Sequence, residues 1–136
     1  MIQIIRDKIN INALLAAVAD PAAGGIDIFI GTTRNHSDGK DVLELEYEAY
    51  QDMALPMMRQ IADDAKERWG VMKIAVVHRI GKVPVGEASV AIAVSSAHRK
   101  EAFEACRYII DTLKKTVPIW KKELFADGSK WVGERP

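Results

Sequence analysis

The chain has 136 residues, a common size for one domain and enough to bury a core without disulfides or a structural metal. Its 19 basic and 19 acidic side chains cancel, which argues against a protein dedicated to nucleic acid or to a membrane surface.

The start of the chain and its cysteine content indicate a compartment. The first ten residues, MIQIIRDKIN, lack the basic start, apolar core and small-residue cleavage site of a signal peptide, and no apolar run reaches eighteen residues. The single cysteine, Cys106, fits a reducing compartment and excludes both a disulfide framework and a cysteine-based metal site. We therefore expect a cytoplasmic protein with one domain over residues 1–136.

The first half of the chain alternates between helical and extended patterns. A short helix is predicted over 10–19, with Asn10 as its N-cap, and a β-branched strand over 24–34. The sequence HSDGK then turns the chain into a strand over 42–50. Its alternation predicts one buried face, made of Leu43, Leu45, Tyr47 and Ala49, and one face of glutamates in water.

The second half begins with an amphipathic helix over 52–69, which Gly70 suits as a C-terminal cap. Neighbouring strands over 73–81 and 88–97 follow, joined by KVPVGE. The last helix is predicted over 98–116. Because so few strand-helix alternations are present, the fold class is α+β.

The last helix has an apolar stripe and a sharp end. Ser95 or Ser96 is the expected N-cap, and Pro118 ends the helix. The stripe, predicted to be buried, consists of Ala102, Phe103, Cys106, Ile109, Ile110, Leu113 and Val117.

Charge is spread unevenly and favours an anion site in the tail. Residues 44–67 hold seven acids and two bases, whereas residues 112–136 hold six bases and three acids. Four of these bases lie in DTLKKTVPIWKKELF, residues 111–125. An anion would be drawn to this part of the chain.

The two lysines at the end of the last helix are not equivalent. Lys114 lies eight residues after Cys106, at the border of the stripe, whereas Lys115 lies four after Asp111 in the orientation of a surface ion pair. Lys114 either snorkels into water or, beside the apolar Pro118 corner and Lys121, does chemistry. A lysine near apolar surface and other cations can have a lowered pKa, which acid-base and nucleophilic catalysis use.

Other basic residues have two interpretations each. Arg34 follows a strand at a glycine-containing turn, and His98 and Arg99 lie at a helix start, where a bound phosphate would offset the conflict of Arg99 and Lys100 with the helix dipole. Equally, Arg99 and Lys100 pair with nearby glutamates or with solvent. His78 at a strand end favours a structural role, and the histidines share no metal-ligand spacing, so we expect no metal and no cofactor.

Three segments together carry a family resemblance. They are FIGTTRNHSDGKDVLELEYEAY, VVHRIGKVPVGEASVAIAVSSAHRKEAFEACRYIIDTLKKTVPIWKKE and DGSKWV. In order and spacing, from about Gly24 to Trp131, the chain resembles the catalytic (large) subunit of molybdopterin synthase. The HRIG, SSAHR and P-x-W-K steps are individually modest but jointly specific.

This resemblance implies a fold, an activity and partners. The fold would be an α/β hammerhead with an additional antiparallel β-sheet. The activity would be sulfur transfer from the C-terminal Gly-Gly thiocarboxylate of a small ubiquitin-like subunit to cyclic pyranopterin monophosphate, which forms the dithiolene of molybdopterin in molybdenum cofactor biosynthesis. The assembly would be a heterotetramer around a homodimer of large subunits.

The resemblance also implies site residues. The catalytic lysines of the L-K and W-K steps fall on Lys114 and Lys121. Substrate-binding residues fall on Arg34, His98 and Arg99, with His98 a possible proton shuttle, and on Arg135, which would serve the neighbouring subunit's pocket. Cys106, mid-helix on the apolar stripe, is a poor sulfur carrier, so the sulfur would arrive on a partner.

Two other functions compete with this one. If the chain is a non-catalytic module that binds an anion, nucleic acid or protein, all six bases of residues 112–136 should contribute similarly to binding, and affinity should fall steeply with salt. Zero net charge and the lack of interleaved aromatic residues argue against nucleic acid. An inactive scaffold dimer is disfavoured because the expected residue types fill the family positions.

Overall fold

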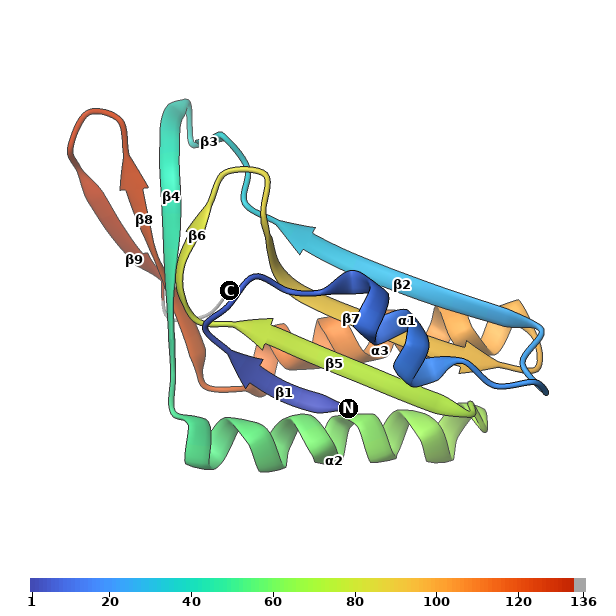
Figure 1. Cartoon of the computed structure of the whole chain (residues 1–136). Helices are drawn as coiled ribbons and strands as arrows, with labels where there is room; N and C mark the ends of the chain where they lie inside the picture. Colours follow the sequence, from blue (N-terminus) through green and yellow to red (C-terminus); the bar gives the residue numbers. More distant parts are fainter. Residues whose placement is uncertain (134–136) are drawn as a thin grey trace.

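The computed structural model describes residues 1–133, which form three helices and nine strands (Figure 1). Along the chain the elements are β1 (Ile2–Ile5), α1 (Ile11–Val18), β2 (Gly25–Thr32), β3 (His36–Ser37), β4 (Lys40–Ala49), α2 (Gln51–Trp69), β5 (Lys73–Arg79), β6 (Gly81–Pro84), β7 (Ala88–Ser96), α3 (Arg99–Thr116), β8 (Ile119–Phe125) and β9 (Lys130–Gly133). None of these helices is long and apolar enough to cross a membrane.

A four-stranded sheet with the order β1-β5-β7-β2 lies between helices (Figure 1). Only the pairing of β1 with β5 is parallel. Ala91 and Ala93 of β7 pack with α1 on one face, while Val90, Ile92 and Val94 pack with α2 and α3 on the other. Because both faces are covered, residues 90–94 in the middle of β7 are all apolar instead of alternating with polar residues.

A second, antiparallel sheet has the order β3-β4-β8-β9, and β6 pairs with β4 beside it. The chain passes from the first sheet to the second between β5 and β6 at Gly81, whose φ of 83° suits glycine. The α+β class and the additional antiparallel sheet expected from the sequence are therefore both confirmed.

The start of α1 and the end of α2 are each stabilised by a capping residue that the sequence predicts. The side chain of Asn10 accepts a hydrogen bond from the Ala13 amide at 3.2 Å, and Gly70, with φ of 61°, donates its amide to Lys66 at 2.9 Å. Both predicted caps are confirmed. The predicted N-cap of α3 is wrong, because Ser95 and Ser96 are buried in β7 and His98 precedes the helix without a side-chain cap.

Two predictions of burial are wrong. Leu43 is 55% exposed because a β-bulge between Val42 and Glu44 shifts the register with β8 and turns Val42 inward instead. Phe103 is 54% exposed on α3, although the other members of the predicted stripe are buried.

Candidate active site

A cavity of about 230 Å³ lies where the end of β2, the C-terminal part of α3 and the second sheet meet. Its walls are formed by Gly31, Thr32, Arg34, His36, Ser37, Val42, Leu45, Tyr47, His78, Ser89, Val90, Ile110, Leu113, Lys114, Lys121 and Glu123. The cavity thus combines residues from β2, β3, β4, β5, β7, α3 and β8.

Among residues 1–133, three cations line this cavity: Arg34, Lys114 and Lys121, here called the cation cluster. Arg34 follows β2 and Lys114 lies in the last turn of α3, and both side chains are exposed. Lys121 on β8 is more enclosed, and its ammonium lies 3.6 Å from Oε1 of Glu123, which is 7% exposed. The two catalytic lysines expected from the sequence are therefore brought together with Arg34.

Behind the cations lies a polar floor made of Tyr47, His78 and Ser89, all buried. The ring of Tyr47 meets that of His78 edge-on, with centroids 5.0 Å apart. Tyr47 hydrogen-bonds Ser89, whose Oγ donates to the Gly31 carbonyl at 3.3 Å. Burial raises the pKa of Tyr47 above its ordinary value of 10.0, and the charge of Glu123 raises it further, so the phenol stays protonated.

His78 is neutral in this floor. Burial lowers the pKa of its imidazole to about 4, and the charge of Lys114 acts in the same direction. The hydrogen bond to the Arg79 carbonyl opposes this shift without cancelling it. The sequence interpretation of His78 as purely structural missed that it lines the cavity.

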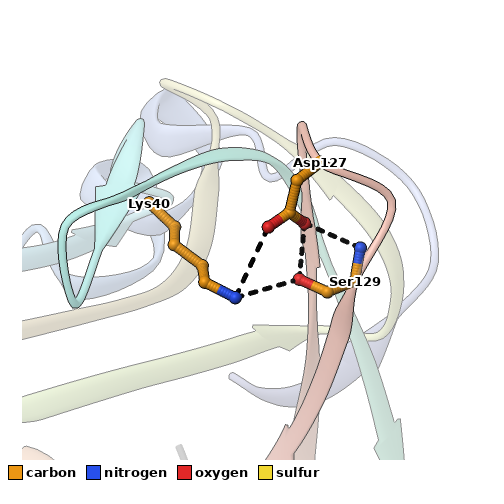
Figure 2. A network of polar contacts seen from close by, with 3 residues as sticks. All are labelled: Lys40, Asp127 and Ser129. Atoms are coloured by element: carbon orange, nitrogen blue, oxygen red, sulfur yellow. Dashed lines mark hydrogen bonds and ion pairs between the residues drawn. The ribbon is translucent and has the colours of Figure 1, made fainter.

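The cavity rim includes a hairpin tied to a distant turn (Figure 2). His36 and Ser37 lie on this hairpin, where Asp38 and Gly39 have φ of 50° and 76°. Lys40 Nζ lies 3.4 Å from Asp127 Oδ2 and donates to Ser129 Oγ at 3.3 Å. Hydrogen bonds from Ser129 lower the pKa of Asp127, so this link persists at neutral pH.

The other predicted site residues lie elsewhere. His98 and Arg99 are at the N-terminal end of α3, beside a separate hollow lined by Gly24, Ala97, His98, Arg99, Lys100 and Glu101. Fifteen residues separate Arg99 from Lys114, which is about 22 Å along the helix. Within one chain the two groups are not brought together. Arg135 lies outside the described residues.

Cys106 is enclosed, as the stripe predicted. It is 2% exposed, its Sγ donates weakly to the Ile92 carbonyl at 3.9 Å, and burial raises the pKa of its thiol to about 12. A thiol with so high a pKa is not a nucleophile at neutral pH. Residues 1–133 also contain no cluster of three or more His, Cys, Asp or Glu placed to hold a metal ion.

Sequence reasoning missed part of the cavity lining: Tyr47, His78, Ser89 and Glu123. One signal was available for Glu123, because it lies two residues after Lys121 and so shares its face if the segment is a strand. The other three come from strands whose shared wall depends on sheet pairing that the sequence does not state.

The fold and the cavity define an α+β protein with a cationic pocket suited to binding a small anion and to stabilising negative charge during a reaction. The model of the MoaE protein family matches residues 4–116. The chain therefore belongs to this family, as the sequence predicted.

Individual relatives agree over nearly the whole chain. The human molybdopterin synthase catalytic subunit is 49% identical over 135 residues, which cover 99% of this chain and 72% of the relative. The crystal structure of molybdopterin synthase from Staphylococcus aureus has a TM-score of 0.90 and 40% identity, covering 96% of this chain and 95% of that one.

A more distant structure shares the fold. The complex of subunits 1 and 2 of the molybdopterin-converting factor from Helicobacter pylori matches with a TM-score of 0.80 at 23% identity, covering 98% of this chain and 91% of that chain. The α/β hammerhead with its additional sheet is thus common to these proteins.

Proposed function

We propose that this protein is the catalytic subunit of a molybdopterin synthase. It transfers sulfur from the C-terminal thiocarboxylate of a small ubiquitin-like subunit to cyclic pyranopterin monophosphate and so forms the dithiolene of molybdopterin. The observation that carries the proposal is the convergence of Arg34, Lys114 and Lys121 on one cavity in a chain of this family.

The three cations have different roles. Lys114, exposed at the end of α3, meets the incoming thiocarboxylate and stabilises the negative charge that develops, or transfers a proton. Lys121, held by Glu123 deeper in the cavity, assists it, and Arg34 binds the phosphate as an anion.

The sulfur comes from a partner chain. Cys106 is enclosed, with a thiol pKa of about 12, and cannot carry a persulfide through the cavity. Arg34 and Lys114 are open to solvent, so an extended, narrow tail ending in Gly-Gly reaches them without rearrangement. No metal or organic cofactor enters this scheme.

A second copy of the chain completes the site. β2 is an edge strand of its sheet, Ile26 and Ile30 on this strand are exposed, and Phe103 on α3 is exposed as well. The Cα of Arg99 lies 3.5 Å from where a Cβ of Gly25 would be, at one end of β2, and Thr32 at the other end lines the cavity. Antiparallel pairing of two β2 edges about a two-fold axis therefore sets His98 and Arg99 beside the partner's cavity.

The remaining assignments extend the same scheme. Arg135 of one copy serves the pocket of its neighbour, and two small subunits complete a heterotetramer around the homodimer. Residues 1–136 act as one domain, in the cytoplasm. A non-catalytic binding module is not favoured, because three cations converge on one cavity while Lys122 of the same basic region pairs with Glu46 at 3.6 Å.

The test is a reconstitution with a thiocarboxylated small subunit and cyclic pyranopterin monophosphate, in which dithiolene product is followed over time. We expect Lys114→Ala to lose about 100-fold or more in rate. The matched control, Lys115→Ala, changes an exposed neighbour on the same helix and retains activity. Wild-type protein that binds the small subunit but forms no product contradicts the enzymatic function.

A further inference from the structure

His78 is a buried titratable group for which the proposed chemistry has no use. It lies in β5 with 1% of its surface exposed, yet it forms part of the cavity wall together with Lys114 and Lys121. A histidine placed there for packing alone would leave polar atoms beside a substrate cavity, which is costly unless they are used.

The hydrogen bonding of His78 fixes which ring nitrogen carries the proton. Nδ1 lies 2.8 Å from the Arg79 carbonyl oxygen, which only accepts hydrogen bonds, so Nδ1 carries the hydrogen. With the ring neutral, Nε2 holds a lone pair and is an acceptor. The pKa of about 4 makes the ring a poor base near neutral pH, so an acceptor role fits better than proton transfer.

The groups around His78 make this acceptor distinctive. The cation cluster supplies only donors. Glu123 is paired with Lys121, and the Gly31 carbonyl already accepts from Ser89. Tyr47, whose ring packs edge-on against His78, forms its hydrogen bond with Ser89. Among the hydrogen bonds of residues 1–133, that of His78 uses Nδ1, so Nε2 is an uncharged acceptor of the floor that remains open to a ligand.

We propose that His78 is a specificity-determining residue: its Nε2 accepts a hydrogen bond from a ring N–H, amino or hydroxyl donor on the uncharged heterocyclic end of the substrate, while the cation cluster holds the phosphate. This inference rests on the proposed function, since a reduced pterin carries such donors. A phosphorylated compound without a donor at that place leaves Nε2 unpaired in a buried site and binds more weakly.

Two substitutions separate recognition from structure. In His78→Asn the side-chain amide takes the place of Nδ1 and still donates to the Arg79 carbonyl, but the acceptor at Nε2 is gone. In His78→Gln the amide oxygen reaches the place of Nε2, and the bond to Arg79 is lost. Calorimetry would measure the affinity of each variant for cyclic pyranopterin monophosphate and for inorganic phosphate.

We expect His78→Asn to bind the pterin about 10- to 100-fold more weakly than wild type and inorganic phosphate equally well. His78→Gln should bind the pterin within about threefold of wild type, because the acceptor is restored. Wild-type affinity in His78→Asn, or equal losses in both variants with native circular dichroism, overturns the inference. A wild-type protein that does not bind the pterin contradicts the proposed function itself.

A measurement on the unmodified protein guards against variants that fail to fold. In the ¹⁵N spectrum of the imidazole, the unprotonated nitrogen of His78 should move upfield when the pterin is added, as expected for a lone pair that gains a donor. Inorganic phosphate should leave this signal in place. An unchanged signal in the presence of saturating pterin overturns the inference.

Discussion

Cys106 illustrates how surroundings make a reactive residue type inert. It lies on α3 between the helix and β7, with its thiol pKa raised to about 12 by burial and by the nearby carboxylate of Asp27. The thiol of Cys106 is therefore a poor carrier for sulfur chemistry in this protein.

We expect Cys106→Ala to retain wild-type sulfur transfer and to lose roughly 1–2 kcal/mol of unfolding free energy, since a small buried side chain is truncated. Urea unfolding and the reconstituted reaction measure the two effects. Iodoacetamide should modify the native thiol only at the rate of unfolding. Loss of activity in a folded Cys106→Ala protein would show that the cysteine takes part.

His78 makes stability depend on pH. Its folded pKa of about 4 lies below the ordinary 6.5, so the unfolded chain binds a proton that the folded chain excludes. The contribution of His78 to the free energy of unfolding is therefore fully present above pH 6.5. It is lost as the pH falls toward 4, by about 3 kcal/mol over this range.

Urea unfolding at pH 7.5 and pH 5 tests this dependence. Wild type should lose unfolding free energy between pH 6.5 and pH 5, and His78→Asn should lose much less. Carboxylates such as Asp127, with its lowered pKa, titrate at lower pH and do not contribute in this range. An equal pH dependence in wild type and variant would mean that another group is responsible.

The sequence reveals a site residue when a local pattern fixes its position in an element. It misses a residue whose position depends on pairing between strands. Helical periodicity places Lys114 at the end of a buried stripe, and the family resemblance then assigns it a catalytic role. Ser89 and His78 were not found, because their common wall forms only when β5 pairs with β7. No local pattern encodes that pairing.

For a whole element, too, a local pattern can predict the wrong face, as strand β4 shows. Its alternation predicted that Leu43 faces the core, but the bulge between Val42 and Glu44 turns Val42 toward the core and Leu43 toward solvent. Helices α1 and α2 were predicted closely because Asn10 and Gly70 mark their ends. Strands β1, β6, β8 and β9 were missed since each is short or charged and is held by its partners.

A pair of substitutions tests the bulge. Val42→Ala should cost about 1–3 kcal/mol of unfolding free energy because Val42 is 5% exposed, whereas Leu43→Ala should change it by less than about 0.5 kcal/mol. Chemical denaturation of the two variants under one set of conditions measures both values. The reverse ranking would mean that β4 runs without a bulge.

At the scale of the whole molecule, the length of β2 matches the distance along α3 that separates the two groups of proposed site residues. Eight residues of strand extend about 26 Å, close to the helical distance between Arg99 and Lys114. In the proposed pairing, two copies joined at this edge each receive His98 and Arg99 from the other.

Mixed dimers test this arrangement. Co-expression of Arg99→Ala with Lys114→Ala should restore about a quarter of the wild-type rate, because half of the dimers are mixed and each of these has one intact site of two. Lys114→Ala mixed with Lys121→Ala is the control, since both residues line the cavity of their own chain and no intact site forms. If the mixture of Arg99→Ala and Lys114→Ala is as inactive as the control mixture, the shared site is contradicted.

The place of β8 in the chain has a consequence for protein synthesis. The cavity takes residues from Gly31 through Glu123, so a ribosome must extend the nascent chain past Glu123 before this cavity is complete. Until β8 emerges, β4 lacks its main neighbour and presents an unpaired edge, which is the kind of surface that promotes aggregation. A premature stop after α3 therefore leaves a chain that still contains the strands of the first sheet but lacks Lys121, Glu123 and the β8 wall of the cavity, and we expect the cell to degrade it.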